Sequence, residues 1–434
     1  MSATAHGSEG NDGSRGKFDL SGSHPAWLRR INAVGRALTG SGAHGAMAVP
    51  LDVASLLAEA RANTGLDDFG PDDGWREGLG VLAQSLDREA RLTLVGRLLA
   101  RADVVNALET RLQVEDAYRR DPSIDDEEVA APLFIVGLPR SGTSILHELL
   151  AQDPAHRVPL SWEARHPCPP PEEATYDTDP RIERCEAYVQ FWNELVPEYR
   201  TMHEMGARIP CECIWLTMPT FVCEEWIGRQ QCPGYAAWYM GADLRPAYAY
   251  HRRLLKLLQH RFRRERWMLK APSHMAALDV LLAEYPDARI LMTHRDPLKS
   301  MGSTASILSA LAWMRSEDAD IGAIRAGFGG EGMAYRLDVA MRAREAADPS
   351  RFFDVRYQDM LSDPFGAIAR AYAHFGIPYT KEAERRMRDY LAAKPQAKHG
   401  AHAYSFDDLG LDVATERARF AAYQERFGVP SEVA

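Results

Sequence analysis

The sequence predicts an α/β fold in which helices flank a parallel sheet, because short apolar runs alternate with helical patterns along its central part. The clearest apolar runs lie at 133–136, 266–270, 289–293 and 352–355. The first of them leads into Gly137-Leu-Pro-Arg-Ser-Gly142, whose glycine spacing is typical of a phosphate-binding loop. We therefore expect a P-loop-like sheet that binds its ligands at the carboxyl ends of the strands.

Composition limits the classes of protein that the chain can be. With 434 residues, of which 46% are hydrophobic and 26% charged, the chain is long enough for one large α/β domain with helical additions. The formal net charge of −10 disfavours nucleic acid as a partner, because contacts to phosphates need a basic surface. No apolar run approaches the ~20 residues of a membrane span, and the first residues lack the order of a secretory signal. We expect a cytoplasmic protein without a transmembrane segment.

The chain divides into regions of different character. We expect a disordered or weakly ordered tail at 1–46, an N-terminal helical region at 47–130, the α/β domain at 131–410 with a helical insertion at 181–265, and a C-terminal helical tail at 411–434. The N-terminal helices contain no cluster of titratable residues, which indicates a cap or a contact in a homo-oligomer.

Two basic helical stretches, 27–38 and 251–266, have alternative interpretations. The first packs on its own domain or on a second subunit, or it touches a membrane surface. The second is a solvated helix face or a membrane attachment. Peripheral membrane contact is therefore an alternative for both stretches.

The insertion is rich in aromatic residues, and the six cysteines of the chain all lie between residues 168 and 232. Aromatic side chains at this density build a core or line a pocket for an apolar small molecule or lipid. The cysteine spacings differ from those of zinc sites, so we expect free thiols and no metal.

The elements around the first loop follow from local patterns. Residues 133–136 form a buried strand, and apolar positions at 145, 146, 149 and 150 indicate an amphipathic helix after the loop. Backbone N–H groups at the start of that helix attract an anion without a metal. Thr143 stands where a nucleotide P-loop has lysine, and Arg140 lies inside the loop instead. A planar guanidinium there favours a fixed grip on one phosphate or sulfate group.

Further strands follow along the chain, each with a polar residue at its end. We expect a second short strand at 158–163, a third at 266–270, a fourth at 289–293 and a fifth at 352–355. Because the carboxyl ends of parallel strands share one edge of a sheet, we expect the polar residues after the strands to converge. These residues are Arg140, Glu163, Lys270, Arg295 and Tyr357.

Pro139-Arg-Ser-Gly-Thr-Ser144 after an apolar strand resembles the loop that holds the 5′-phosphosulfate group in sulfotransferases that use 3′-phosphoadenosine 5′-phosphosulfate (PAPS). The resemblance is to the branches with arginine in the loop, such as the Golgi and tyrosylprotein sulfotransferases and their bacterial relatives. It implies that PAPS is the sulfuryl donor and that the loop holds its 5′-phosphosulfate with Arg140, Ser141, Gly142, Thr143 and Ser144.

A second segment, Ile290-Leu-Met-Thr-His-Arg295-Asp-Pro-Leu-Lys-Ser-Met-Gly-Ser303, is similar to the 3′-phosphate motif of the same family. There an arginine at a strand end and a serine eight positions later hold the 3′-phosphate, which implies this role for Arg295 and Ser303. We expect Asp296 to be the ion partner of Arg295, and we expect no metal. The basic loop 394–400, with Lys398, is expected to serve as a tether or as a flap over the nucleotide.

The resemblance also implies catalytic residues. Lys270 matches the strand-end lysine that offsets charge on the leaving nucleotide. Glu163 matches the glutamate that serves as the general base in the Golgi and tyrosylprotein branches. His203 in the insertion is the rival base, and His274 is a third candidate that more readily packs at a helix start.

The sequence therefore predicts a PAPS-dependent sulfotransferase that acts on a hydroxyl or amine of a small, apolar or lipid-like acceptor. Sulfuryl transfer is an in-line displacement, so catalysis consists mainly of positioning and charge stabilisation. The alternatives are a nucleotide kinase or NTPase with the same scaffold, and a nucleotide-binding protein without catalytic activity.

Overall fold

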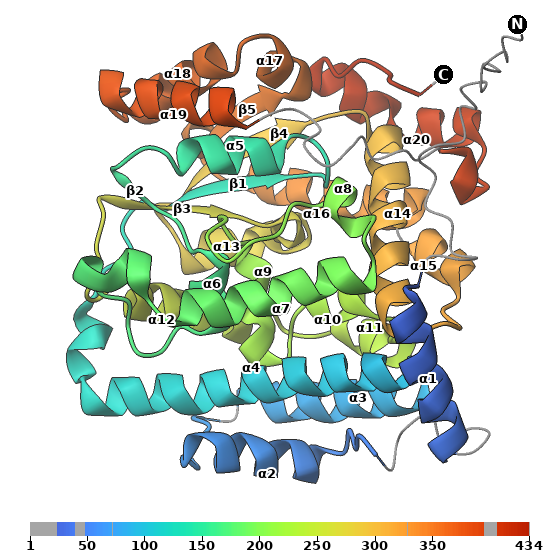
Figure 1. Cartoon of the computed structure of the whole chain (residues 1–434). Coiled ribbons are helices and arrows are strands. Elements are labelled where there is room, and N and C mark those ends of the chain that lie inside the picture. Colours follow the sequence, from blue (N-terminus) through green and yellow to red (C-terminus); the bar gives the residue numbers. More distant parts are fainter. Residues whose placement is uncertain (1–23, 40–47, 72, 328, 395–405, 434) are drawn as a thin grey trace, which may run out of the picture.

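The computed structural model describes residues 24–39, 48–71, 73–327, 329–394 and 406–433, and its centre is a parallel sheet (Figure 1). The strand order is β2-β3-β1-β4-β5, and every pair of neighbouring strands is parallel. The strands are β1 (Leu133–Gly137), β2 (His156–Arg157), β3 (Arg266–Lys270), β4 (Arg289–His294) and β5 (Phe352–Arg356). The predicted α/β class is confirmed.

One strand differs from its prediction. The second strand was expected at 158–163, but β2 covers only two residues before that segment, and helix α6 (Ser161–Arg165) follows instead. The helix forms because the Glu163 carboxylate turns back to the backbone N–H of Leu160, at 2.9 Å, and satisfies an amide at the helix start. Glu163 therefore lies in a helix rather than at a strand end.

The two faces of the sheet are covered by different helices. Successive side chains of a strand point to opposite faces. Leu133 and Ile135 of β1 pack in a cluster with residues of α5 (Thr143–Leu150), α18 (Pro364–Phe375) and α19 (Lys381–Ala393). Phe134 and Val136 pack in another cluster with residues of α12 (Arg245–Gln259), α13 (Leu278–Glu284) and α16 (Gly330–Ala346). The sheet is thus the middle layer of three, as Figure 1 shows.

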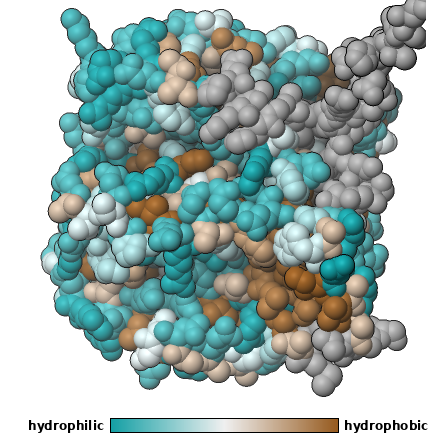
Figure 2. All heavy atoms as spheres, viewed as in Figure 1, coloured by the Kyte–Doolittle hydropathy of each residue, from teal (hydrophilic) through white to brown (hydrophobic). Residues whose placement is uncertain are grey.

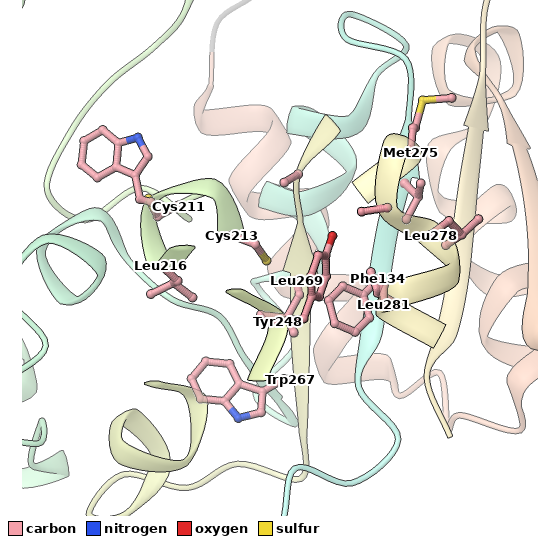
Figure 3. Close-up of a cluster of buried hydrophobic side chains, with 14 of the residues drawn as sticks. Phe134, Cys211, Cys213, Leu216, Tyr248, Trp267, Leu269, Met275, Leu278 and Leu281 are labelled. Carbon is pink, nitrogen blue, oxygen red and sulfur yellow. The ribbon is translucent and has the colours of Figure 1, made fainter. Parts of the chain in front are cut away.

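The insertion belongs to the second of these clusters. Figure 3 shows part of it, with Cys213 and Leu216 from the insertion, Tyr248 from α12, and Leu269 from β3. The insertion helices are α7 (Arg181–Leu195), α8 (Tyr199–Met202), α9 (Cys213–Thr217), α10 (Glu225–Arg229) and α11 (Pro233–Tyr239). All six cysteines are free thiols, and only Cys168 is not buried.

The N-terminal helices form a layer of their own beneath the insertion in Figure 1. They are α1 (Ala26–Thr39), α2 (Val53–Thr64), α3 (Trp75–Arg88) and α4 (Leu94–Arg120). Apolar residues of α2, α3 and α4 share a cluster with Phe221, Trp226 and Tyr235 of the insertion, whereas Leu28 of α1 packs in a different cluster with Trp192. This layer therefore supports the insertion, whereas the predicted domain boundaries stay a prediction.

The two basic stretches differ in their surroundings. Leu28 and Asn32 of α1 are buried against the rest of the chain, whereas Trp27, Ile31 and Val34 are exposed. In α12, Arg252 pairs with Glu284 and Arg253 with Glu115, so these two arginines have partners within the protein.

The remaining helices follow β4 and β5. They are α14 (Pro297–Arg315), α15 (Ile321–Gly327), α17 (Tyr357–Ser362) and α20 (Val413–Phe427). Asp296 caps α14 by accepting from the backbone N–H of Leu298 at 3.0 Å, and Pro297 occupies the first turn, so the helix begins directly after Arg295. Among the helices of the described residues, none is long and apolar enough to cross a membrane.

Candidate active site

A cavity of about 530 Å³ lies at the carboxyl ends of the strands, between the phosphate loop and the insertion. Eight of the residues singled out from the sequence line it: Arg140, Gly142, Thr143, Ser144, His203, Lys270, Arg295 and Tyr357. Ser141, Glu163 and Ser303 do not line it, and Lys398 lies outside the described residues. The topology thus brings most of the predicted residues together.

The phosphate loop has a backbone that few residue types can adopt. Gly142 has φ +90°, and a Cβ atom there would lie 3.2 Å from Cδ2 of Tyr357. Both conditions require glycine. Arg140 also has a positive φ of 66°, and its Nη1 donates to the carbonyl oxygen of Met202 at 3.1 Å. The loop therefore passes close to α8 of the insertion, and α5 begins immediately after Gly142.

Ser141 holds the loop together. Its backbone N–H donates to the carbonyl oxygen of Leu138 at 3.2 Å. Its Oγ lies 2.6 Å from that same oxygen and 2.6 Å from Oγ1 of Thr293 on β4. The side chain is fully buried, and its expected contact with the phosphosulfate stays a prediction.

Arg295 lies at the end of β4, and three groups hold its guanidinium. Nη1 donates to the carbonyl oxygen of Arg140 at 2.8 Å, and the ring of Tyr357 lies 3.8 Å from the guanidinium carbon. Nε and Nη2 pair with the two carboxylate oxygens of Glu432, at 2.8 and 2.7 Å. The guanidinium therefore connects the phosphate loop with the C-terminal segment.

Asp296 is not the partner of Arg295, contrary to the sequence-based expectation. Its carboxylate pairs with Arg417 of α20 at 2.8 and 3.1 Å, and it accepts from the backbone N–H of Glu432 and Val433. The Asp296 oxygens are occupied by these donors and by the backbone N–H of Leu298 at the start of α14. As a result the C-terminal segment, rather than Asp296, supplies the acid beside Arg295.

Ser303 lies in the second turn of α14 and is fully buried. Its Oγ has no hydrogen-bond partner among the described residues. Its expected contact with a 3′-phosphate stays a prediction.

Lys270 connects the phosphate loop with the insertion. Its Nζ lies 3.4 Å from Oγ of Ser144 and forms an ion pair with Glu212, which precedes α9. Nε2 of His203 lies 4.0 Å from the same Glu212 oxygen. Burial opposes the charge of Glu212, but Lys270 and then His203 hold the pKa of its carboxyl well below its usual range. Lys270, Glu212 and His203 thus form a chain of polar groups along the cavity.

Glu212 lines the cavity but was not among the residues predicted from the sequence. It is the acid in Pro210-Cys-Glu-Cys213, a polar residue between two cysteines that are themselves buried. That isolated charge in an apolar segment is the signal that could have found it. No local pattern indicates its contact with Lys270, which is 58 residues away.

Glu163 has a structural role, which corrects its expected place at the cavity. It is fully buried, and its Oε2 accepts from Nη1 of Arg157 at 3.1 Å and from the hydroxyl of Tyr176 at 2.7 Å. Burial disfavours the charged guanidinium, but Glu163 outweighs this effect and raises the pKa of Arg157. With its oxygens committed to these donors, Glu163 is in no position to take a proton from a ligand in the cavity.

The third base candidate is also accounted for by packing. His274 is buried, and its Nδ1 lies 2.7 Å from the Tyr248 hydroxyl. Burial lowers the pKa of His274 to about 3.

Part of the cavity lining is apolar, and we call it the apolar arm. It is lined by Trp192, Tyr199, Met202, Ile214, Trp215, Ile307, Leu308 and Leu311. His203 follows Met202 of this arm along the chain, and its ring is stacked at 6.5 Å from that of Tyr199. The cavity therefore has a cationic end and an apolar end, which meet at Glu212.

A further cation comes from the end of α19. Lys394 lines the cavity, pairs with Glu204 at 2.8 Å, and also pairs with Glu148 of α5. It is the first residue of the basic loop singled out from the sequence; the next residues of that loop are not described. In the described part of the chain, no group of three or more His, Cys, Asp and Glu residues is arranged to hold a metal ion.

Comparison with known proteins gives consistent results. The model of the sulfotransferase family matches residues 132–381. The chain is similar to sulfotransferase STF1 of Mycobacterium tuberculosis, with 34% identity, a TM-score of 0.74, and coverage of 86% of this chain and 98% of that one. It is similar to sulfotransferase STF9 of Mycobacterium avium, with 32% identity, a TM-score of 0.79, and coverage of 88% and 98%.

The chain is also similar to the ω-hydroxy-β-dihydromenaquinone-9 sulfotransferase Stf3 of Mycobacterium bovis. The two are 29% identical over 295 residues, which cover 64% of this chain and 71% of that protein. The matched region of the family includes the phosphate loop, Glu212, Lys270 and Arg295.

Proposed function

The chain belongs to the sulfotransferase family, and from this premise we propose that it transfers a sulfuryl group from PAPS to a hydroxyl or amine of an apolar acceptor. One observation carries the proposal: Lys270 connects Ser144 of the phosphate loop with Glu212, where the cationic end of the cavity meets the apolar arm. The proposed donor site and the proposed acceptor site therefore adjoin at this ion pair.

The cationic end fits a donor with two phosphate-bearing ends. The start of α5, with Thr143, Ser144 and Arg140, would hold the 5′-phosphosulfate through backbone N–H groups and charge-assisted hydrogen bonds. Arg295 would hold the 3′-phosphate. These cations line one cavity in a chain of net charge −10, so the positive potential is local to the site.

Lys270 and Glu212 supply the chemistry of transfer. The acceptor oxygen forms a bond to sulfur while the bond from sulfur to the phosphate oxygen breaks, and the bisphosphate leaves with the bonding pair. Lys270 offsets the charge that develops on the leaving oxygen. Glu212 takes the proton of the acceptor hydroxyl, and His203 beside it is the second candidate for that role.

The ion pair itself gives a reason for the timing of proton transfer. While Lys270 contacts Glu212, the pKa of the carboxyl is low, and the carboxylate is a weak base. When Lys270 turns toward a bound donor, Glu212 loses its main counter-ion and its basicity rises. The base is therefore active only when the donor is in place.

The apolar arm favours an apolar acceptor. Aromatic and aliphatic side chains of this kind exclude water and bind apolar surface. The similar Stf3 protein is named for an acceptor that is a hydroxylated menaquinone, which is a lipid-like molecule with an alcohol group. We extend this acceptor class, an apolar alcohol, to the present chain. The predicted cytoplasmic location, the absence of a nucleic-acid partner and a homo-oligomer stay predictions.

Isothermal titration with 3′-phosphoadenosine 5′-phosphate, without metal, tests the donor site. We expect binding that Arg295→Ala weakens by about 2 kcal/mol or more, the scale of a lost charged hydrogen bond. Glu432→Gln is the matched control: it keeps Arg295 and removes the carboxylate paired with it, so the bisphosphate should bind equally or more tightly. Preference for ATP with Mg²⁺, or affinity independent of Arg295, would contradict the proposal and favour a kinase.

A further inference from the structure

Glu225 is a charged residue that borders the apolar arm and has no part in the proposed transfer. It lies in the first turn of α10, which packs against α14, and it lines the cavity. Its Oε1 accepts from Nε of Arg229 at 2.8 Å. The guanidinium of Arg229 lies 5.1 Å from the ring of Trp192 and 5.2 Å from that of Trp215, two residues of the apolar arm.

Behind Glu225 lies a buried cluster of charges. Asp103 pairs with Arg229 at 2.8 Å, with Arg165 at 3.4 Å and with Arg315 at 3.4 Å. Three guanidinium groups thus share one aspartate, and Glu225 is the second acid of the cluster. The arginines hold the Glu225 carboxylate in place, since Arg229 is itself fully buried and fixed by Asp103.

The two members of the ion pair between Glu225 and Arg229 differ in burial. The side chain of Arg229 has no exposed surface, whereas that of Glu225 is 17% exposed. Since Glu225 lines the cavity, its carboxylate is open to a ligand there, and its partner is not. The adjacent Glu224 turns away and pairs with Arg336, and it does not line the cavity. A polar group in an otherwise apolar pocket typically fixes the orientation of a ligand.

We propose that Glu225 forms a second polar subsite of the apolar arm, which accepts a hydrogen bond from a hydroxyl or N–H group of the acceptor remote from the group that is sulfated. This inference rests on the proposed sulfotransferase function. It restricts the acceptor class to apolar molecules with two hydrogen-bonding groups, such as diols and polyhydroxylated lipids.

The charge around Glu225 favours a neutral donor group over a cation. An ammonium group near Glu225 would also lie near Arg229 and the two further arginines behind it, which repel it. A hydroxyl group has a smaller desolvation cost than an ammonium group, and it gains a charge-assisted hydrogen bond.

The surroundings of Glu212 and Glu225 support separate roles. Lys270 holds the pKa of Glu212 low, whereas burial raises the pKa of Glu225 against the opposing effect of Arg229. Glu212 contacts the proposed catalytic lysine, and Glu225 contacts the aromatic arm. The subsite therefore acts in recognition, and the proton is taken elsewhere.

The test compares 1-alkanols with α,ω-alkanediols of equal length, from hexane to dodecane derivatives, as acceptors with PAPS. For wild type we expect kcat/KM to favour the best diol over the equal alkanol by about tenfold or more, mainly through KM. Glu225→Leu should bring this ratio close to one, and Glu225→Gln should keep part of it because the amide oxygen still accepts. Glu224→Gln, the control beside the subsite, should leave the ratio unchanged.

Binding is measured separately through the quenching of tryptophan fluorescence by the same alcohols, because Trp192 and Trp215 line the arm. If no alcohol is sulfated, the proposed function fails for these acceptors. The ratio of the quenching constants of diol and alkanol still tests whether Glu225 forms a subsite. Equal constants for diol and alkanol at every length, absence of saturable quenching by any diol, or a ratio that survives Glu225→Leu would overturn the inference. Thermal unfolding of both Glu225 variants shows whether loss of the preference for diols reflects misfolding.

Discussion

Glu163 and Glu212 differ in what surrounds their carboxylates. Glu163 is enclosed by Arg157 and Tyr176 and has no exposed surface, whereas Glu212 lines the cavity beside Lys270. A residue that takes a proton must reach the reacting group. Geometry therefore favours Glu212 over Glu163 as the proposed base, and Glu163 has a structural role.

Glutamine substitutions separate these roles. Glu212→Gln should lower kcat by about 10²- to 10⁴-fold, as expected for loss of a general base. Glu163→Gln should lower the free energy of unfolding by about 3–5 kcal/mol, because it leaves the buried Arg157 without its counter-charge. Steady-state kinetics and urea unfolding of both variants measure this.

The opposite pattern, with kcat dependent on Glu163 at unchanged stability, would restore Glu163 as the base. If Glu212→Gln retains full turnover and His203→Gln loses it, the base is His203.

At the scale of elements, α1 has two contrasting faces. Leu28 is buried in a cluster that includes Trp192, Tyr199 and Met202 of the apolar arm. On its other face Trp27, Ile31 and Val34 are exposed. Figure 2 shows apolar side chains gathered at the lower right, where Figure 1 shows α1 and the start of α4. Leu98 of α4 is also half exposed, and α1 itself has three arginines and no acid.

This composition predicts binding of α1 to an anionic lipid surface. The triple variant Trp27→Ser, Ile31→Ser and Val34→Ser should weaken co-sedimentation with phosphatidylglycerol vesicles by at least about tenfold, because each substitution removes exposed apolar surface. Leu361→Ser is the control, since Leu361 of α17 is 64% exposed and lies outside this face.

Equal sedimentation of wild type and triple variant would contradict membrane binding by α1. If the triple substitution instead abolishes a concentration-dependent dimer in analytical ultracentrifugation, the exposed face packs against a second copy of the chain.

At the scale of the whole molecule, buried histidines couple stability to pH. Burial lowers the pKa of His147, His251 and His274 to about 3 each, from an ordinary value of 6.5. Between these values the unfolded chain binds more protons than the folded one. Stability is therefore complete above pH 6.5 and falls as the pH decreases toward 3, by roughly 1.4 kcal/mol per pH unit for each histidine.

Urea unfolding at pH 7.5 and pH 5.5 checks this linkage. The urea concentration at the unfolding midpoint should be lower at pH 5.5. In His251→Gln this midpoint should depend less on pH, because glutamine does not titrate. His251 is a suitable site because burial is the sole cause of its pKa shift and its ring contacts the Tyr285 hydroxyl, away from the cavity lining. An unchanged slope in that variant would show that His251 does not contribute.

Local patterns determined the sheet and the cationic half of the cavity. Four of the strands, the glycine-containing loop and the strand-end positions of Arg140, Lys270 and Arg295 were predictable, because periodicity and loop spacing are properties of neighbouring residues. The parallel order then brings strand ends together whatever the intervening sequence is.

Only the tertiary structure decided the partners of those residues. Lys270 meets Glu212 across 58 positions, and Arg295 meets Glu432 across 137. Glu163, which matched a family position, turned inward because α6 replaced the expected strand and Arg157 was within reach. Such pairings depend on how helices pack, and packing is set by volume and burial over the whole chain rather than by any pattern along it.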